Sequence, residues 1–259
     1  MPNMSSYAPG VPNWVDLATT DIDAAKNFYG DLFGWQPNVS PDPQYGGYTM
    51  FTLPGEAGGE VAAAMTIMNP AQPPAWTAYV NVLDADATAK AVQAAGGQLF
   101  MEPMDVPEQG RMVVFADTQG AVIAGWQPYG FKGAGVVNEP NSWCWSELNC
   151  RNIEPAKAFY AEVFGWESST AAFGSTTYTE FKVGGNSIAG MMQMDENWPP
   201  DVPSHWINYF AVSDADAIAA KTAELGGTVA VPPTDMTIGR FAILSDPQGA
   251  NFAIIRLAG

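Results

Sequence analysis

Cationic side chains, cysteine and histidine are scarce in this sequence. Its 259 residues include ten Lys and Arg, two Cys and one His, against 27 Asp and Glu, and the formal net charge is −17. A surface this acidic repels phosphate backbones and anionic lipid headgroups at separations below the screening length. We therefore expect neither a nucleic-acid partner nor a membrane partner.

Long apolar runs are also missing. A membrane-spanning helix needs about 18 or more consecutive apolar residues, and no stretch of the sequence reaches that length. The opening MPNMSSYAPG has no basic segment followed by an apolar run, so it does not resemble a secretory signal. Cys144 and Cys150 lie in one predicted strand, roughly 20 Å apart, which is beyond disulfide reach. These features predict a cytoplasmic protein with reduced thiols.

What the sequence does contain is a repeat of itself. WVDLATTDIDAAKNFYGDLFGW at 14–35 matches WSELNCRNIEPAKAFYAEVFGW at 145–166, WTAYVNVLDADA at 76–87 matches WINYFAVSDADA at 206–217, and GRMVVFADTQGA at 110–121 matches GRFAILSDPQGA at 239–250. Two copies in tandem predict two similar domains. We assign residues 1–10 to a flexible N-terminus, 11–130 to the first domain, 131–140 to a linker rich in Gly, and 141–259 to the second domain.

Each copy shows the same order of elements. In the first copy, alternation predicts a strand from 14, Asp21 offers a helix N-cap and Gly34 closes the helix. Short strands at 47–53 and 60–68, a strand at 76–84, an Ala-rich helix at 84–97 and two strands around the DTQG turn follow. The fold class is therefore α+β, with four βαβββ units in the chain.

The ordered motifs resemble a known family. Three motifs occur in the same order in both copies and cover residues 11–257: D/E-x-A-x-x-F-Y-x-x-x-F-G-W, a strand ending in D-A-D-A, and G-R-x7-Q-G-A. The set resembles the vicinal oxygen chelate superfamily, which includes glyoxalase I, bleomycin-resistance proteins and extradiol dioxygenases, and is similar to its tandem glyoxalase-like or hydroxylase-like members. The resemblance implies mixed sheets that curl around cavities, with a divalent metal in the active members.

The metal positions that the resemblance implies hold none of the usual ligands. They map onto Trp14 and Trp145, Thr77 and Ile207, and Ala124 and Ala253. A transition-metal site needs three or four converging N, O or S donors, which these residues do not supply. There is also no Gly-rich phosphate loop. We therefore expect no metal and no other cofactor, and a rearranged metal site around His205 and Glu147 is the alternative.

Strand alternation places a Trp and an acid together on the face that points into the cavity in this family. The same alternation adds aromatic and polar residues from neighbouring strands, and burial among them should raise the pKa of an acid toward neutrality. We predict Asp16 and Glu147 as general acid or base and His205 as a proton shuttle. The predicted ligand-binding residues are Trp14, Trp145, Trp126, Thr77, Tyr79 and Tyr209.

Each of these residues also has a structural alternative. The acids could serve only as acceptors for a neighbouring indole or tyrosine, the tryptophans could simply fill a core, and His205 could cap a loop. Arg111 and Arg240 are interpreted as structural partners of the acids in the DTQG and DPQG turns, with the steering of anions as the alternative. Cys144 and Cys150 have the opposite parity to Trp145 and Glu147, which favours structural or surface thiols over a nucleophile.

Three functions are compatible with this pattern. The first is a metal-independent enzyme that uses carboxylate acid/base chemistry on a hydrophobic, aromatic or polyketide-like carbonyl metabolite, as a lyase, isomerase or hydroxylase-like protein. The second is a protein that sequesters a drug or metabolite without chemistry, and the third is a metal-dependent glyoxalase or dioxygenase with atypical ligands. The expected partner is a small hydrophobic or aromatic ligand, and the chain is expected to be a monomer or a homodimer.

Overall fold

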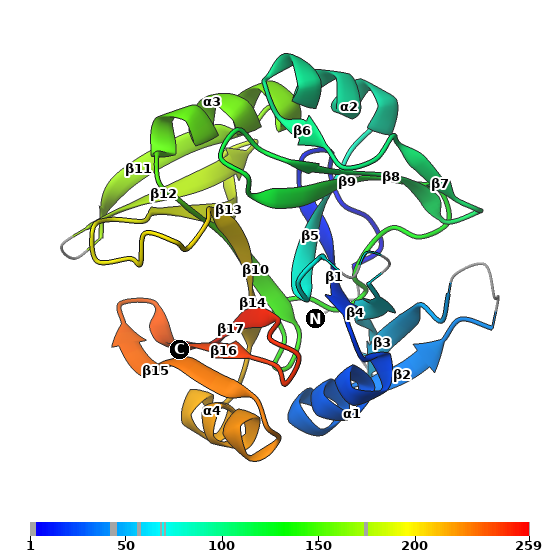
Figure 1. Ribbon diagram of the computed structural model, residues 1–259, viewed down its shortest axis with the longest axis vertical. Coiled ribbons are helices and arrows are strands. Elements are labelled where there is room, and N and C mark those ends of the chain that lie inside the picture. The colour runs from blue at the N-terminus through cyan, green and yellow to red at the C-terminus, as the bar shows by residue number, and fades with distance from the viewer. Residues whose placement is uncertain are drawn as a thin grey trace.

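Two curled sheets, each formed by one copy of the repeat, make up the protein (Figure 1). The computed structural model describes residues 4–41, 46–55, 58–67, 69, 71–173 and 176–258. Among these residues it contains the two repeated halves and the mixed α+β architecture that the sequence predicts. The first three residues of the predicted N-terminal segment lie outside the described part of the chain.

The first copy alternates strands with two helices. Its elements are β1 (Pro12–Thr19), α1 (Ile22–Phe33), β2 (Gln36–Val39), β3 (Thr49–Leu53), β4 (Gly59–Thr66), β5 (Ala75–Asn81), α2 (Ala85–Ala94), β6 (Gln98–Leu99), β7 (Met104–Val106), β8 (Gly110–Ala116) and β9 (Val122–Pro128). The sheet order is β2-β3-β4-β1-β5-β9-β8-β6, with β7 also paired to β8. The first strand of the copy therefore lies in the middle of its sheet.

The second copy repeats this plan. Its elements are β10 (Trp143–Cys150), α3 (Ile153–Phe164), β11 (Glu167–Phe173), β12 (Thr176–Val183), β13 (Asn186–Gln193), β14 (His205–Ala211), α4 (Ala215–Glu224), β15 (Thr228–Met236), β16 (Gly239–Ser245) and β17 (Asn251–Leu257). The order β11-β12-β13-β10-β14-β17-β16-β15 places β10 centrally, as β1 is in the first sheet.

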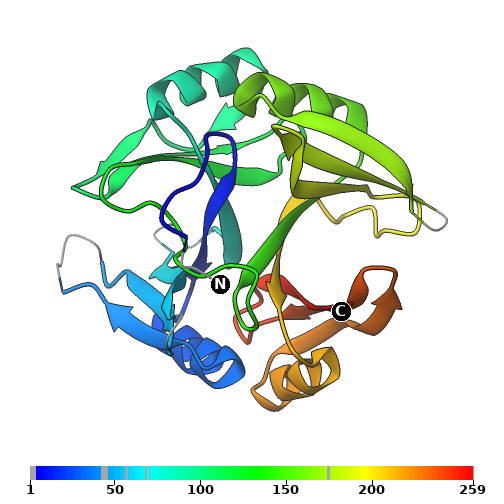
Figure 2. The same ribbon diagram turned by 180° about the vertical axis from the view of Figure 1, so that it is seen from behind.

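The helices begin and end where the sequence predicts. The Asp21 side chain accepts a hydrogen bond from the Ala24 backbone N–H, and Gly34 ends α1; in α3 the same positions are taken by Asn152 and Gly165. The buried side of α1 carries Phe28, and the corresponding Phe159 is buried in α3. Figures 1 and 2 show α1 beside α4 and α2 beside α3, at opposite ends of the molecule.

The two copies are joined by a reciprocal pair of buried hydrogen bonds. Tyr29 on α1 donates to Asp246 in the DPQG turn of the second copy at 3.1 Å, and Tyr160 on α3 donates to Asp117 in the DTQG turn of the first at 2.9 Å. An indole N–H, from Trp76 or Trp206, donates to each of these hydroxyl oxygens. The F-Y and D-x-Q-G motifs therefore connect the two copies, a role that the sequence prediction does not assign to them.

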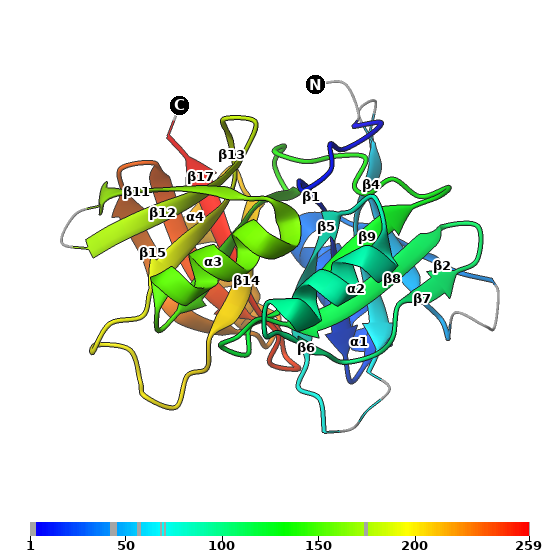
Figure 3. The ribbon, with the colours of Figure 1, turned by 90° about the horizontal axis from the view of Figure 1, so that it is seen from above.

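The segment between the copies packs against the first sheet. Ala134 is fully buried, and its N–H donates to the carbonyl of Asn13 on β1 at 2.8 Å. Gly133 has φ +123°, and a Cβ there would lie 2.3 Å from the Asn13 carbonyl oxygen, so only glycine fits this approach. Tyr7 from the N-terminal segment donates to the Ala134 carbonyl. In Figure 3 this connection crosses near the N-terminus.

Removing one interdomain hydroxyl should weaken the fold. Tyr29→Phe and Tyr160→Phe each leave a buried aspartate without one donor, and we expect a loss of about 1–3 kcal/mol in the free energy of unfolding. Tyr129→Phe is the matched control, because the Tyr129 hydroxyl contacts Asp105 on the exposed surface, and it should change stability by less than about 0.5 kcal/mol. Urea denaturation measures all three; equal stability of the buried and exposed variants would contradict this role.

Candidate functional site

A buried glutamate lies at the centre of the second sheet, beneath two tyrosines. Glu147 on β10 is 6 % exposed, and the Tyr209 hydroxyl on β14 donates to its Oε1 at 3.2 Å. The Tyr178 hydroxyl on β12 also lies close to this carboxyl group and opposes the rise of its pKa. Tyr178 in turn accepts from the indole N–H of Trp145 at 2.9 Å. Four side chains from three strands thus form one connected polar network.

The first sheet contains the same network. Tyr79 on β5 donates to Asp16 Oδ2 at 2.9 Å, and Tyr48, just before β3, donates to the same oxygen at 3.4 Å. The indole N–H of Trp14 donates to the Tyr48 oxygen at 3.2 Å. The pairs of Trp and acid predicted from strand alternation therefore do share a face, and each pair is linked through a tyrosine.

The sequence prediction omits Tyr48 and Tyr178. Both occur in a repeated Y-T-x-F pattern, YTMF at 48–51 and YTEF at 178–181. Because the side chains of a strand alternate, a Tyr that starts this pattern faces away from the buried Phe51 or Phe181. The repeat of the tyrosine in both copies was the signal that could have identified it.

Burial raises the pKa of both acids. Desolvation raises the pKa of Asp16 to about 7 and that of Glu147 to about 7, and the tyrosine hydrogen bonds oppose the shift only in part. Each acid can therefore hold or release a proton near neutral pH. The four tyrosine hydroxyls around the two acids have raised pKa values, chiefly because they are buried, so they remain protonated donors.

In the second copy, the structure places this network on the wall of a large cavity. The cavity has a volume of about 910 Å³ and is lined by Trp145, Glu147, Tyr178, Tyr209 and mainly apolar side chains such as Phe241. This volume is at the upper end of the range for small-molecule sites. Glu147 therefore borders a space large enough for a ligand of several fused rings.

In the first copy, the segment after β9 packs onto the corresponding face. The Phe131 ring packs edge-on against Trp14 at 4.8 Å between ring centroids and lies 6.1 Å from the ring of Trp126. The Trp126 indole N–H donates to the Phe131 carbonyl at 2.9 Å. Trp14, Trp126 and Tyr79 are consequently buried, with at most 7 % exposure. The structural alternative, core filling, thus describes the tryptophans of the first copy.

The remaining predicted residues have different surroundings. His205 lines the cavity of the second copy, and its Nδ1 lies 2.9 Å from the Pro203 carbonyl oxygen. Its register partner is Asn149, whereas Glu147 pairs with Ile207, so His205 lies two residues along β14 from the position opposite the acid. Thr77 in the first copy pairs with Asp16 in the register of β1 and β5.

Cys144 lies in the cavity wall although simple strand alternation would place it on the opposite face from Trp145. The register of β10 against β14 shifts between Trp143 and Trp145, and this β-bulge turns Cys144 toward the cavity, which it lines. Trp143 is left in the core on the other side of the sheet. Burial raises the pKa of the Cys144 thiol to about 12, so it is not activated as a nucleophile.

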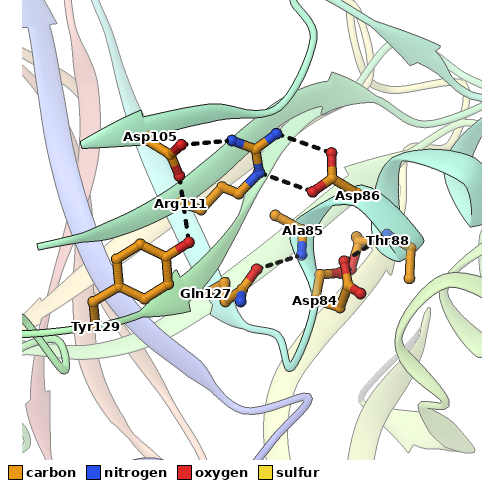
Figure 4. Close-up of polar contacts among 9 residues, drawn as sticks. Asp84, Ala85, Asp86, Thr88, Asp105, Arg111, Gln127 and Tyr129 are labelled. Carbon is orange, nitrogen blue, oxygen red and sulfur yellow. Dashed lines mark hydrogen bonds and ion pairs between the residues drawn. The ribbon is translucent and has the colours of Figure 1, made fainter. Parts of the chain in front are cut away.

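The two arginines have other partners than the sequence suggests. Figure 4 shows the Arg111 guanidinium between Asp86, at the start of α2, and Asp105 on β7, with Nε 2.9 Å from Asp86. Arg240 makes the matching contacts to Asp216 and Asp235. The predicted partners in the DTQG and DPQG turns accept the interdomain tyrosines instead. Both arginines are structural and tie a helix start to a hairpin.

Comparison with known proteins identifies the family to which these repeated motifs belong. The model of the glyoxalase/bleomycin resistance protein/dioxygenase superfamily matches residues 11–124 and 144–254. The chain belongs to this superfamily. "Putative glyoxylase CFP32" of Mycobacterium tuberculosis is 43% identical over 100% of this chain and 99% of its own length. "Anthracycline biosynthesis protein DnrV" of Streptomyces peucetius is 38% identical over 98% and 96%.

Solved structures of the superfamily share the fold. The Mn(II)-bound glyoxalase from Novosphingobium aromaticivorans has a TM-score of 0.63 at 17% identity and covers 95% of this chain and 82% of its own. The 2,3-dioxygenase LapB from Pseudomonas sp. KL28 has a TM-score of 0.65 at 15% identity, over 100% and 94%. At such identities the likeness shows the fold alone. The recognition of the family from its repeated motifs is confirmed.

The residues present do not fit the metal that the superfamily implies. Across residues 4–258, apart from the few that the structure does not describe, no three His, Cys, Asp or Glu side chains group as a metal site. The side-chain hydroxyls that interact with Glu147 come from Tyr178 and Tyr209, and its register partner on β14 is Ile207. Neutral, protonated phenols are poor ligands for Zn²⁺ or Fe²⁺ compared with His or carboxylate.

The described helices contain no candidate for a membrane span.

The raised pKa values make stability depend on pH. Between the pKa of an unfolded Glu and about 7, the folded chain keeps the proton on Glu147 while the unfolded chain loses it, so this group lowers stability as pH rises. Glu147→Gln removes the effect. We expect its stability relative to the parent protein to increase by up to roughly 1.4 kcal/mol per pH unit between about pH 5 and 7, measured by urea denaturation. A difference that is constant with pH would refute the raised pKa.

Proposed function

We propose that the protein is a metal-independent enzyme that binds a planar hydrophobic ketone in the cavity of the second copy and transfers a proton with Glu147. The observation that carries this proposal is the position of one carboxyl group, with a pKa of about 7, in the wall of an aromatic-lined cavity of about 910 Å³. A general base is most effective when its pKa lies near the working pH.

The chemistry that suits this arrangement is proton removal next to a carbonyl group. The Glu147 carboxylate takes a proton from the carbon, the C–H electron pair forms the C=C bond of an enolate, and the carbonyl π electrons move to its oxygen. Return of the proton to another position completes an isomerisation. The hydroxyls of Tyr178 and Tyr209 hold the carboxyl group in place.

The ligand class is inferred from the walls and from one relative. Trp145 and Tyr178 present flat rings to the cavity, and Phe241 and Ile243 add apolar surface, which suits a fused aromatic ring system. The relative named for anthracycline biosynthesis, 38% identical over nearly the whole chain, supports a polyketide-like ketone. Metal independence is supported by the donor set around Glu147.

The experiment uses anthrone, a planar tricyclic ketone with an acidic methylene group. Proton removal from that methylene in D₂O is followed by NMR as deuterium uptake. Glu147→Gln should reduce the protein-catalysed exchange at least about a hundredfold, the usual scale of general-base catalysis. Asp16→Asn is the matched control, because Asp16 has two corresponding tyrosine partners, Tyr48 and Tyr79. Asp16 lies in the copy where Phe131 packs over the concave face, so the Asp16→Asn variant should retain exchange.

The pH profile gives a second measure of the same reaction. Because the ionised carboxylate is the base, exchange should rise as pH passes about 7 and level off above it. Loss of exchange in Asp16→Asn together with normal exchange in Glu147→Gln would assign the reaction to the first copy and overturn the proposal.

A sequestering protein is the second candidate, favoured by the contacts of the Tyr209 and Tyr178 hydroxyls with Glu147, which stabilise the carboxyl group without a ligand. For a protein of this kind, Trp145→Ala should weaken anthrone binding, measured by quenching of tryptophan fluorescence, while no deuterium enters anthrone above the background rate. If the parent protein binds anthrone but does not catalyse its deuterium exchange, the result supports sequestration and contradicts the enzyme proposal.

A further inference from the structure

The cavity of the second copy contains a polar pair that the proton-transfer chemistry does not use. Asn149 on β10 and His205 on β14 face each other in the strand register, and both line the cavity. They lie two residues along the sheet from Glu147, a separation of roughly 6–7 Å. The pair thus borders a different part of the same space.

The carboxamide of Asn149 is buried with an unmet hydrogen-bonding group. Asn149 is 2 % exposed, and its Oδ1 has no hydrogen-bond partner among the described residues. Leaving a buried polar atom unpaired costs about 1–3 kcal/mol. The two ends of a carboxamide exchange by rotation about χ2, so either the oxygen or the NH₂ group can be turned to the cavity. An unpaired amide on a cavity wall is expected where a ligand supplies the missing partner.

His205 is oriented so that its second nitrogen remains available. Nδ1 lies 2.9 Å from the Pro203 carbonyl oxygen, and because a carbonyl can only accept, Nδ1 carries the hydrogen. In the neutral imidazole, Nε2 is then an acceptor. The Trp198 ring, 6.1 Å from the imidazole ring and also in the cavity wall, gives this end of the cavity an aromatic side.

The first copy provides an internal comparison. The positions that correspond to Asn149 and His205 are Ala18 and Ala75, which face each other in the register of β1 and β5. The copy whose concave face is covered by Phe131 therefore has two alanines where the copy with the large cavity has two hydrogen-bonding side chains. Packing of the fold does not require polar groups at these positions.

We infer that Asn149 and His205 form a subsite for a hydroxyl group of the ligand, about two residues' length along the strand from the proton-transfer position at Glu147. A phenolic hydroxyl donates to Nε2 of His205 and accepts from the Asn149 amide. The inference rests on the proposed function for the site and narrows its substrate class to hydroxylated fused-ring ketones, with the hydroxyl on the side of the ring system away from the reacting carbon.

The test compares two probes that differ only in hydroxyl groups. Anthrone has none, and 2,7-dihydroxyanthrone carries hydroxyls that are directed away from its methylene and are too far from its carbonyl to bond to it. Binding to the full chain is measured without oxygen by quenching of tryptophan fluorescence. The parent protein should bind 2,7-dihydroxyanthrone at least about tenfold more tightly than anthrone. Asn149→Leu and His205→Leu should each remove most of this preference while affinity for anthrone stays within about twofold.

Controls separate recognition from a structural role. Ser169→Ala removes another hydroxyl from the cavity wall and should keep the preference. The Asn149→Leu variant should melt at the same temperature as the parent protein or higher, because the carboxamide oxygen that it removes has no hydrogen-bond partner among the described residues. A lower melting temperature with an unchanged preference would show that the residue is structural and would overturn the inference.

The outcomes also separate this inference from the proposed function. Binding is measured at equilibrium, so it does not depend on proton exchange. Loss of the preference in Asn149→Leu supports the subsite whatever the exchange assay shows. Intact exchange in Glu147→Gln contradicts only the proposed chemistry. Equal affinity of the parent protein for the two probes, or binding of neither, would overturn the subsite, because the inference names this ligand class.

Discussion

The burial of a carboxyl group beneath two tyrosine hydroxyls is the interaction on which the site depends. In each copy the central strand brings the acid inward, a neighbouring strand supplies one tyrosine, and an indole N–H fixes the second. Desolvation raises the pKa of each acid by more than the two tyrosine hydroxyls lower it, so the pKa rises to about 7. Each copy therefore contains a carboxyl group that can exchange a proton near neutral pH.

Both copies contain the same arrangement of a Trp, an acid and two Tyr side chains, but the surroundings of this arrangement differ between them. In the first copy the segment after β9 lays Phe131 against Trp14 and Trp126. In the second copy the same face borders a cavity, and Cys144, Asn149 and His205 add polar groups to its wall. The reciprocal bonds of Tyr29 and Tyr160 hold the copies together, so the cavity of the second copy is attached to a packed first copy.

The sequence predicted the repeat, the helices and the strand face shared by Trp14 and Asp16, because these depend on local periodicity. It could not predict features that depend on contacts between distant segments. Cys144 reached the cavity through a β-bulge, Arg111 paired with Asp105 and Asp86 rather than with a turn acid, and the interdomain Tyr–Asp bonds join separate copies. Tyr178 was predictable in principle but was missed, since only the repeated Y-T-x-F pattern indicates it.

The titration of the Glu147 carboxyl group tests the account most directly. Protein labelled with ¹³C at the glutamate side-chain carboxyls can be titrated by NMR, and the signal lost in Glu147→Gln identifies the residue. The account predicts a midpoint near pH 7, displaced when a ligand enters the cavity. A midpoint at the ordinary value of an exposed glutamate, about 4.3, would contradict it.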